Sequence, residues 1–141
     1  MKIFVICSKK FYNKIEKIKD KLENMGHEIY LPNCYDAPDT EAKMKTLGKE
    51  KHQKFKEQMY KQSEEIIKSV NAVLVLNFDK EKDGQIQKNY IGGATFLEMY
   101  DAFKNNKKIY LYHEIPEGIL YDEIEGFAPI ILNEDLSIIN K

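Results

Sequence analysis

Arginine is absent from this chain of 141 residues, so its 22 basic side chains are all lysine. A phosphate site in this protein could not use the two-pronged guanidinium contact and would depend on backbone N–H groups, hydroxyls and lysine. An excess of charge of one sign is also lacking, because 23 acidic residues leave a formal net charge of -1. This balance argues against a nucleic-acid partner and against a polybasic membrane anchor.

Cysteine and long hydrophobic runs are scarce as well. Cys7 and Cys34 have neither the spacing of a metal knuckle nor the density of a disulfide framework, so we expect two reduced thiols and no metal site. The first apolar run, within KIFVIC, is too short for a signal peptide or a membrane span, and the expected location is the cytoplasm. With 43% apolar residues, the chain can form one core, so we expect a single domain over residues 1–141.

The sequence that is present alternates between strand and helix patterns. Strands are expected at residues 2–7, 27–32, 72–78, 107–113 and 128–132, with helices between them, whereas residues 33–48 and 79–93 read as loops. This alternation predicts an α/β fold with an open parallel sheet covered by helices on both faces. Right-handed crossovers favour the strand order 2-1-3-4-5, which is a flavodoxin-like, Rossmann-like three-layer sandwich.

Polar residues gather where the expected strands end. Ligands of such sheets bind beyond the carboxyl ends of the strands, at the switch between the first and third strands. The segments that leave these strands are residues 8–12 and 77–79, and residues 89–98 are expected nearby. The sequence therefore predicts one crevice that collects most of its unusual polar side chains.

The stretch NYIGGATFLEMYDAF, residues 89–103, places Glu98 inside an apolar run. Thr95 and Glu98 match a capping box, in which the two side chains bond each other's backbone N–H at a helix start. A chemical role is also possible, since the two glycines allow a close backbone approach and free N–H groups at a helix start favour anions. The core face of this helix is expected to comprise Phe96, Leu97, Tyr100 and Phe103, which would leave open space above an ionised Glu98.

The segments LVLNFDK, NYIGGATFLEMYDAF and KKIYLYHEIPE, with a first strand ending in ICS, resemble the nucleoside 2-deoxyribosyltransferase-like superfamily, which includes the nucleoside 5'-monophosphate N-glycosidases. The resemblance implies an enzyme without a cofactor that cleaves or exchanges the N-glycosidic bond of a small nucleoside or nucleotide. It places Glu98 as the nucleophile, and Ser8 with Phe11 or Tyr12 as substrate contacts. It also implies a homodimer or larger homo-oligomer, since relatives often complete the pocket with a neighbour's residues.

Two departures from the superfamily pattern concern the acid that would protonate the leaving base. Its members carry an aspartate on the helix before the third strand, where SEEIIKS leaves only Glu64 or Glu65 here, and their second acidic residue is Gly92 in this chain. Asp79 is a third candidate acid. The motif GGATFLE also resembles the GGxGTxxE signature of the lysine-decarboxylase-like phosphoribohydrolases, one residue short, which supports a nucleotide ligand.

Further substrate contacts are predicted around the same crevice. Gly92, Gly93 and Thr95 would shape an anion pocket with backbone and hydroxyl donors, and Asn77 leaves the third strand beside them. Asp79 could bind sugar hydroxyls, and Asn89 could contact a base edge or simply hold its loop. Two alternatives stay open at this point: a nucleotide-binding sensor without catalysis, and a scaffold in which the Thr95–Glu98 pair is only a helix cap.

Overall fold

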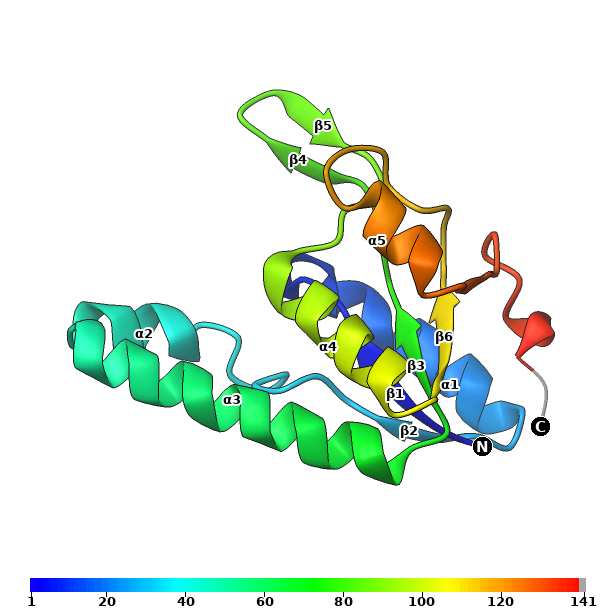
Figure 1. Ribbon diagram of the computed structural model, residues 1–141, viewed down its shortest axis with the longest axis horizontal. Helices are drawn as coiled ribbons and strands as arrows, with labels where there is room; N and C mark the ends of the chain where they lie inside the picture. Colours follow the sequence, from blue (N-terminus) through cyan, green and yellow to red (C-terminus); the bar gives the residue numbers. More distant parts are fainter. Residues whose placement is uncertain (140–141) are drawn as a thin grey trace.

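A five-stranded parallel sheet forms the centre of the computed structural model, which describes residues 1–139 (Figure 1). The strand order is β2-β1-β3-β6-β7, so the predicted order 2-1-3-4-5 of the five sheet strands is confirmed. The sheet strands are β1 (Lys2–Ile6), β2 (Glu28–Tyr30), β3 (Ala72–Val75), β6 (Lys108–Leu111) and β7 (Ile130–Ile131). The last two residues of the expected domain, 140 and 141, lie outside the described part.

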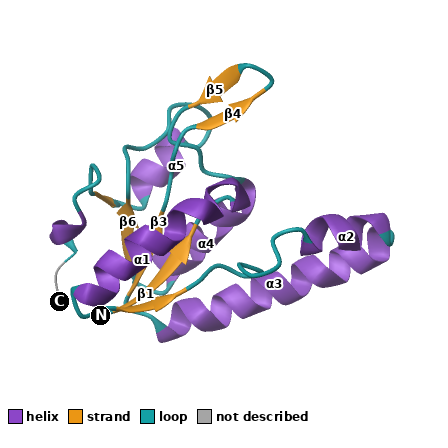
Figure 2. Cartoon of the chain, turned by 180° about the vertical axis from the view of Figure 1, so that it is seen from behind, coloured by secondary structure: helices purple, strands orange, loops and turns teal. Residues whose placement is uncertain are grey.

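Helices cover both faces of the sheet and give the predicted three layers (Figures 1 and 2). They are the 3-10 helices η1 (Lys9–Lys14) and η2 (Leu136–Ile138) and the α-helices α1 (Ile15–Asn24), α2 (Thr40–Thr46), α3 (Lys49–Ser69), α4 (Gly93–Lys104) and α5 (Tyr121–Gly126). Ile3 and Val5 of β1 pack with α1, whereas Phe4 and Ile6 pack on the face covered by α3, α4 and α5. Because β1 is covered on both faces, every one of its residues after Lys2 is apolar.

Helix α3 extends well beyond the sheet and, with α2 packed along its first half, forms an arm at the left of Figure 1. Only Ser63 and Ile67 of its 21 residues are buried. The second half of α3 lies against α4 and the sheet, so this helix brings polar side chains to the side of α4. Among residues 1–139, no helix combines the length and the hydropathy needed to cross a bilayer.

Two expected loops contain regular structure, so these predictions were wrong. Helix α2 lies within residues 33–48 and buries none of its side chains, which explains why no apolar periodicity marked it. Strands β4 (Lys80–Lys82) and β5 (Gln85–Gln87) form an antiparallel hairpin within residues 79–93. Asp83 and Gly84 both have positive φ, as a two-residue hairpin turn requires, but the two strands are polar and mostly exposed and gave no strand pattern.

Candidate active site

A cavity of about 490 Å³ opens on the α3 and α4 side of the sheet, beside the carboxyl end of β1. Five segments form its wall: the β1 exit, the chain after β2, the start of α2, the cavity side of α3, and one side of α4 along its whole length. Of the predicted site residues, the cavity is lined by Ser8, Tyr12, Gly92, Gly93, Thr95 and Glu98. The structure thus brings together predicted residues from two distant parts of the sequence around one space.

Glu98 is partly buried and is one of the residues that line the cavity. Its Oε2 accepts a hydrogen bond of 2.7 Å from Ser63 Oγ on α3. Burial raises the pKa of Glu98 to about 7, while the Ser63 hydrogen bond and the positive charge of Lys56 oppose this change and the negative charge of Asp101 adds to it. Both protonation states of Glu98 are therefore populated near neutral pH. The sequence predicted that the nearby helix start would keep Glu98 ionised. That prediction did not take into account the burial of Glu98, which favours the protonated form.

The predicted capping box is wrong. Helix α4 begins at Gly93 with Gly92 as its N-cap, so Thr95 lies inside the first turn, and no side chain caps the helix. Thr95 is 4% exposed, and the side chain of Glu98 is turned to Ser63 rather than back to the helix start. The N–H groups that precede Phe96 have no partner among the helix carbonyls and belong to residues that line the cavity.

The expected core face of α4 is wrong for three of its four residues, whereas Phe96 is partly buried and packs against the core. Leu97, Tyr100 and Phe103 are 49%, 47% and 46% exposed, while the buried residues of the helix are Thr95, Met99 and Ala102. Apolar residues surround this helix on nearly all sides, so periodicity could not select the inner face. Consequently Glu98 does not lie opposite the core, but at the border where α4 meets α3.

Two polar residues that the sequence did not single out, Asn33 and Ser63, connect Glu98 to the segment after β2. Asn33 Nδ2 donates to Ser63 Oγ at 2.7 Å and to the backbone oxygen of Met59 at 3.2 Å. The hydroxyl of Tyr12 donates to the backbone oxygen of Asn33 at 3.1 Å. Ser63 had a signal in the sequence, because it stands four residues after Met59 and four before Ile67, as a polar residue within the apolar stripe of α3.

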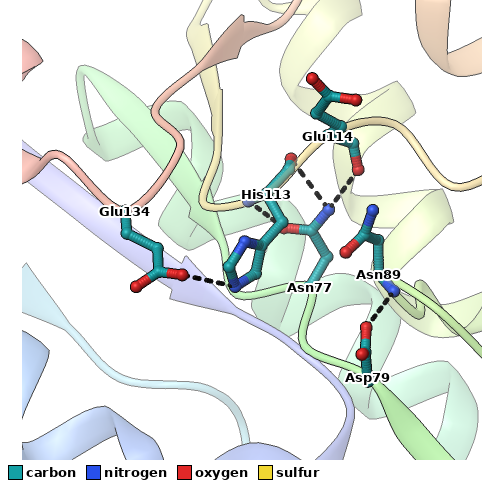
Figure 3. A network of polar contacts seen from close by, with 6 residues as sticks. All are labelled: Asn77, Asp79, Asn89, His113, Glu114 and Glu134. Carbon is teal, nitrogen blue, oxygen red and sulfur yellow. Dashed lines mark hydrogen bonds and ion pairs between the residues drawn. The ribbon is translucent and has the colours of Figure 1, made fainter.

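Asp79 and Asn89 lie at a different place, in a second cavity of about 410 Å³ that also includes Lys14, Phe78, Lys88 and His113. Asp79 Oδ1 accepts a hydrogen bond of 3.0 Å from the backbone N–H of Asn89 (Figure 3). Asn89 has φ 53°, so the carboxylate holds the tight turn that follows β5. The single crevice expected from the sequence is therefore divided into two.

Asn77 and Phe11 line neither cavity. Asn77 is fully buried, and its amide donates to the backbone oxygens of His113 and Glu114 and accepts from the N–H of His113 (Figure 3). These three hydrogen bonds connect the exit of β3 to the exit of β6. They use most of the hydrogen-bonding capacity of the Asn77 amide, so little of it remains for a ligand. Phe11 is 3% exposed and packs edge-on against Phe78, so the structure gives both residues structural surroundings in place of the predicted substrate contacts.

The candidate acids of α3 differ in their positions. Glu64 lines the cavity, and its Oε1 lies 3.0 Å from Lys68 Nζ. Glu65 does not line the cavity and lies 4.0 Å from the same lysine on the exposed side of the helix. Of Glu64, Glu65 and Asp79, only Glu64 is thus at the cavity of Glu98.

Lysine supplies the positive charge of the cavity wall. Lys9, Lys56 and Lys104 come from η1, α3 and α4 respectively. Lys56 lies 3.7 Å from Glu41 and above the ring of Tyr60, and Lys104 lies above the ring of Tyr100. These contacts keep the two long side chains along the wall, where an anionic group of a ligand could meet them.

Among solved structures, the chain is similar to a 2-deoxyribosyltransferase from the psychrotolerant bacterium Bacillus psychrosaccharolyticus, described as a biocatalyst for the synthesis of nucleosides. The TM-score is 0.53 at 18% identity, and the alignment covers 93% of this chain and 98% of that one. No protein-family model and no curated protein sequence matches. The chain therefore has a nucleoside 2-deoxyribosyltransferase-like fold, as the resemblance of its motifs predicted.

Proposed function

We propose that this protein cleaves or transfers the N-glycosidic bond of a nucleoside or nucleoside 5'-monophosphate, with Glu98 as the nucleophile. The observation that carries the proposal is the position of Glu98, which lines a cavity of about 490 Å³ beside the carboxyl end of β1. The similarity in fold to a 2-deoxyribosyltransferase supports the same class of reaction. We place this activity in the cytoplasm, in line with the two free cysteines.

In the proposed reaction, an oxygen of ionised Glu98 attacks C1' of the sugar. The bond between C1' and the base nitrogen breaks, and its electron pair leaves with the base, which takes up a proton. Water or a second base then attacks C1', the bond between C1' and the Glu98 oxygen breaks, and the carboxylate is restored. Because the first step needs the ionised form and the pKa of Glu98 is about 7, the rate should increase as the pH rises through neutrality.

The remaining cavity residues are assigned as substrate contacts by the same proposal. Ser8 and Thr95 offer hydroxyls, and the Tyr12 ring offers an apolar wall because its hydroxyl is already bonded to Asn33. A 5'-phosphate would meet the free N–H groups around Gly93 and a lysine of the wall, which replaces the absent arginine. A side chain at Gly93 would extend into open space, so glycine keeps this approach free.

We propose Glu64 as the acid that protonates the leaving base. It is the only one of the three candidate acids that lines the cavity. One of its oxygens contacts Lys68, so the base would have to reach the other oxygen or displace the lysine. This arrangement favours a slow enzyme, or a substrate whose base leaves readily.

We also propose that the protein forms a homodimer through the outer face of α4. The side chains of Leu97, Tyr100 and Phe103 are about half exposed on this face, and the rings of Tyr100 and Phe103 contact Phe127. Exposed apolar side chains that cluster in this way are typical of protein–protein contact sites. Leu97 and Tyr100 also line the cavity, so a partner on this face would help to enclose the substrate.

The test is to incubate the purified protein with a panel of nucleosides and 5'-monophosphates, with and without acceptor bases, and to follow free base by chromatography. We expect base release or exchange that is lost in Glu98→Gln. Glu65→Gln is the matched control, because it removes the same charge from an exposed position outside the cavity. The proposal fails if no substrate turns over, or if Glu98→Gln is as active as the unchanged protein.

A nucleotide-binding sensor without catalysis is the second candidate function. It is favoured by one observation, namely that the α3 side chain bonded to Glu98 is the hydroxyl of Ser63 and not a second carboxylate. This candidate predicts that a 5'-monophosphate raises the melting temperature, since a ligand that binds only the folded state stabilises it. The same samples should then contain no free base.

A further inference from the structure

The hydrogen bonds between Asn33, Ser63 and Glu98 have a fixed direction. The backbone oxygen of Met59 can only accept, so the atom of the Asn33 amide that lies 3.2 Å from it must be the nitrogen. The other hydrogen of the same nitrogen is then directed at Ser63 Oγ, at 2.7 Å. Rotating the amide by 180° would place its oxygen against the Met59 oxygen and remove that bond, and the Ser63 hydroxyl would then donate to Asn33 in place of Glu98.

This direction determines where the proton of Ser63 lies. Because Ser63 Oγ accepts from Asn33, its single proton is free to point to Glu98 Oε2, which is 2.7 Å away. A hydroxyl that donates to a carboxylate stabilises the ionised form. The donor is therefore fixed by a residue that does not itself contact Glu98.

Asn33 is held in place from two sides. Its backbone oxygen accepts from the hydroxyl of Tyr12, and its amide nitrogen is anchored on α3 through Met59. Its Oδ1 is buried and has no hydrogen-bond partner among the described residues.

The other groups around Glu98 do not replace this hydrogen bond. Lys56 on α3 favours the ionised carboxylate through its charge, and Asp101 on α4 disfavours it. Cys7 at the β1 exit and Tyr12 in η1 have pKa values raised by burial, so both remain neutral near pH 7. Burial raises the pKa of Glu98 by more than the other groups lower it. Among the groups that lower this pKa, the hydrogen bond from Ser63 has the largest effect.

We infer that Asn33 and Ser63 form a positioning pair, in which Asn33 orients the Ser63 hydroxyl and Ser63 holds the Glu98 carboxylate in its ionised, cavity-facing state. Neither residue reacts with the substrate in this inference. The inference rests on the proposed function in one respect, namely that ionised Glu98 is the nucleophile. The pair deepens that proposal, because it names the groups that keep a buried carboxylate usable at neutral pH.

The test measures the pKa of Glu98 by NMR, with 13C-carboxyl-labelled glutamate and Glu98→Gln to assign the signal. We expect Ser63→Ala to raise this pKa by about one pH unit, because it removes a hydrogen bond to a charged group. Asn33→Leu should raise it by a smaller amount, since the Ser63 hydroxyl remains but is free to turn. Ser63→Thr keeps the hydroxyl and should leave the pKa near its original value.

Ser69→Ala is the matched control. Ser69 is on the same helix, and its hydroxyl bonds only the backbone oxygen of Ile66, away from the cavity. A merely structural role for the pair would lower the melting temperature without changing the pKa of Glu98. The inference is overturned if both Ser63→Ala and Asn33→Leu leave that pKa unchanged; should one variant fail to fold, the other decides.

Turnover gives a second readout that separates this inference from the proposed function. If the enzyme is active, Ser63→Ala should lose about tenfold in kcat/KM near pH 6 and little near pH 9, because the ionised fraction of Glu98 falls only on the acidic side. If Ser63→Ala is active and the acidic side of its pH–rate profile is unchanged, the positioning pair is contradicted, whereas the proposed function is not. If the variants raise the pKa of Glu98 but the unchanged protein turns over no substrate, the proposed function is contradicted, whereas the positioning pair is not.

Discussion

The buried charge of Glu98 should cost the protein stability, and replacing this residue with glutamine should recover it. The pKa of Glu98 is raised from 4.5 to about 7, mainly by burial. The folded state therefore binds the proton more tightly than the unfolded chain, and the stability contributed by this group falls as the pH rises from about 4.5 through about 7.

The size of the effect follows from this pKa difference of about 2.5 pH units. At about 1.4 kcal/mol for each pH unit, ionised Glu98 lowers the free energy of unfolding by about 3 kcal/mol above neutral pH. Glutamine is neutral at every pH, has nearly the same shape, and can still accept the hydrogen bond from Ser63. Glu98→Gln should thus be about 3 kcal/mol more stable than the unchanged protein near pH 8 and nearly equal to it near pH 4.

The assay is urea unfolding of both proteins at a series of pH values, followed by circular dichroism, with Glu65→Gln as the control. Glu65 is exposed, so its replacement should give a difference that stays small and does not depend on pH. The reasoning is refuted if Glu98→Gln is less stable than the unchanged protein near pH 8. A difference that is constant from pH 4 to pH 8 would refute it equally, because burial of the charge would then not be its cause.

Three further predictions concern the surroundings of the site. Asn77→Ala should lower the free energy of unfolding by about 2 to 4 kcal/mol, since it removes three hydrogen bonds to partly buried backbone groups of His113 and Glu114, and KM should not change. A raised KM with full stability would make Asn77 a substrate contact. Replacing residues 80–87 with a short glycine linker should leave the urea midpoint nearly unchanged, because the hairpin is mostly exposed, and a large loss would show hidden packing. Phe103→Asp should convert the proposed dimer to a monomer in light scattering, and an unchanged mass would exclude this face.

The architecture could be predicted because each sheet strand carried its own signal. Strand β3 is apolar on both faces, and the helices that alternate with the strands leave few right-handed arrangements. The helix end at Gly26 was also readable, since this glycine has φ 93°. By contrast α2 and the β4–β5 hairpin bury almost nothing, so their formation left no hydrophobic pattern in the sequence.

The candidate site could be predicted in part. Glu98 and the Gly92–Gly93 pair were found because a charged residue after two glycines is conspicuous in an apolar segment. Asn33 and Ser63 were missed because the two hydrogen bonds that lead from Asn33 to Glu98 join residues 30 and 35 positions apart in the sequence, and only the packing of α3 on α4 brings Ser63 to Glu98. The raised pKa of Glu98 could not be predicted from the sequence either, because it is caused by burial, and the burial depends on that same packing.

The central claim is that Glu98 bonds covalently to the sugar, and trapping this intermediate tests it most directly. The protein is incubated with a nucleoside that carries fluorine at C2', which slows the release of the sugar, and is then digested for mass spectrometry. We expect a peptide whose mass is increased by the fluorinated sugar on Glu98, and no such peptide from Glu98→Gln. Release of the base while Glu98 stays unmodified, or a modification on another residue, would contradict it.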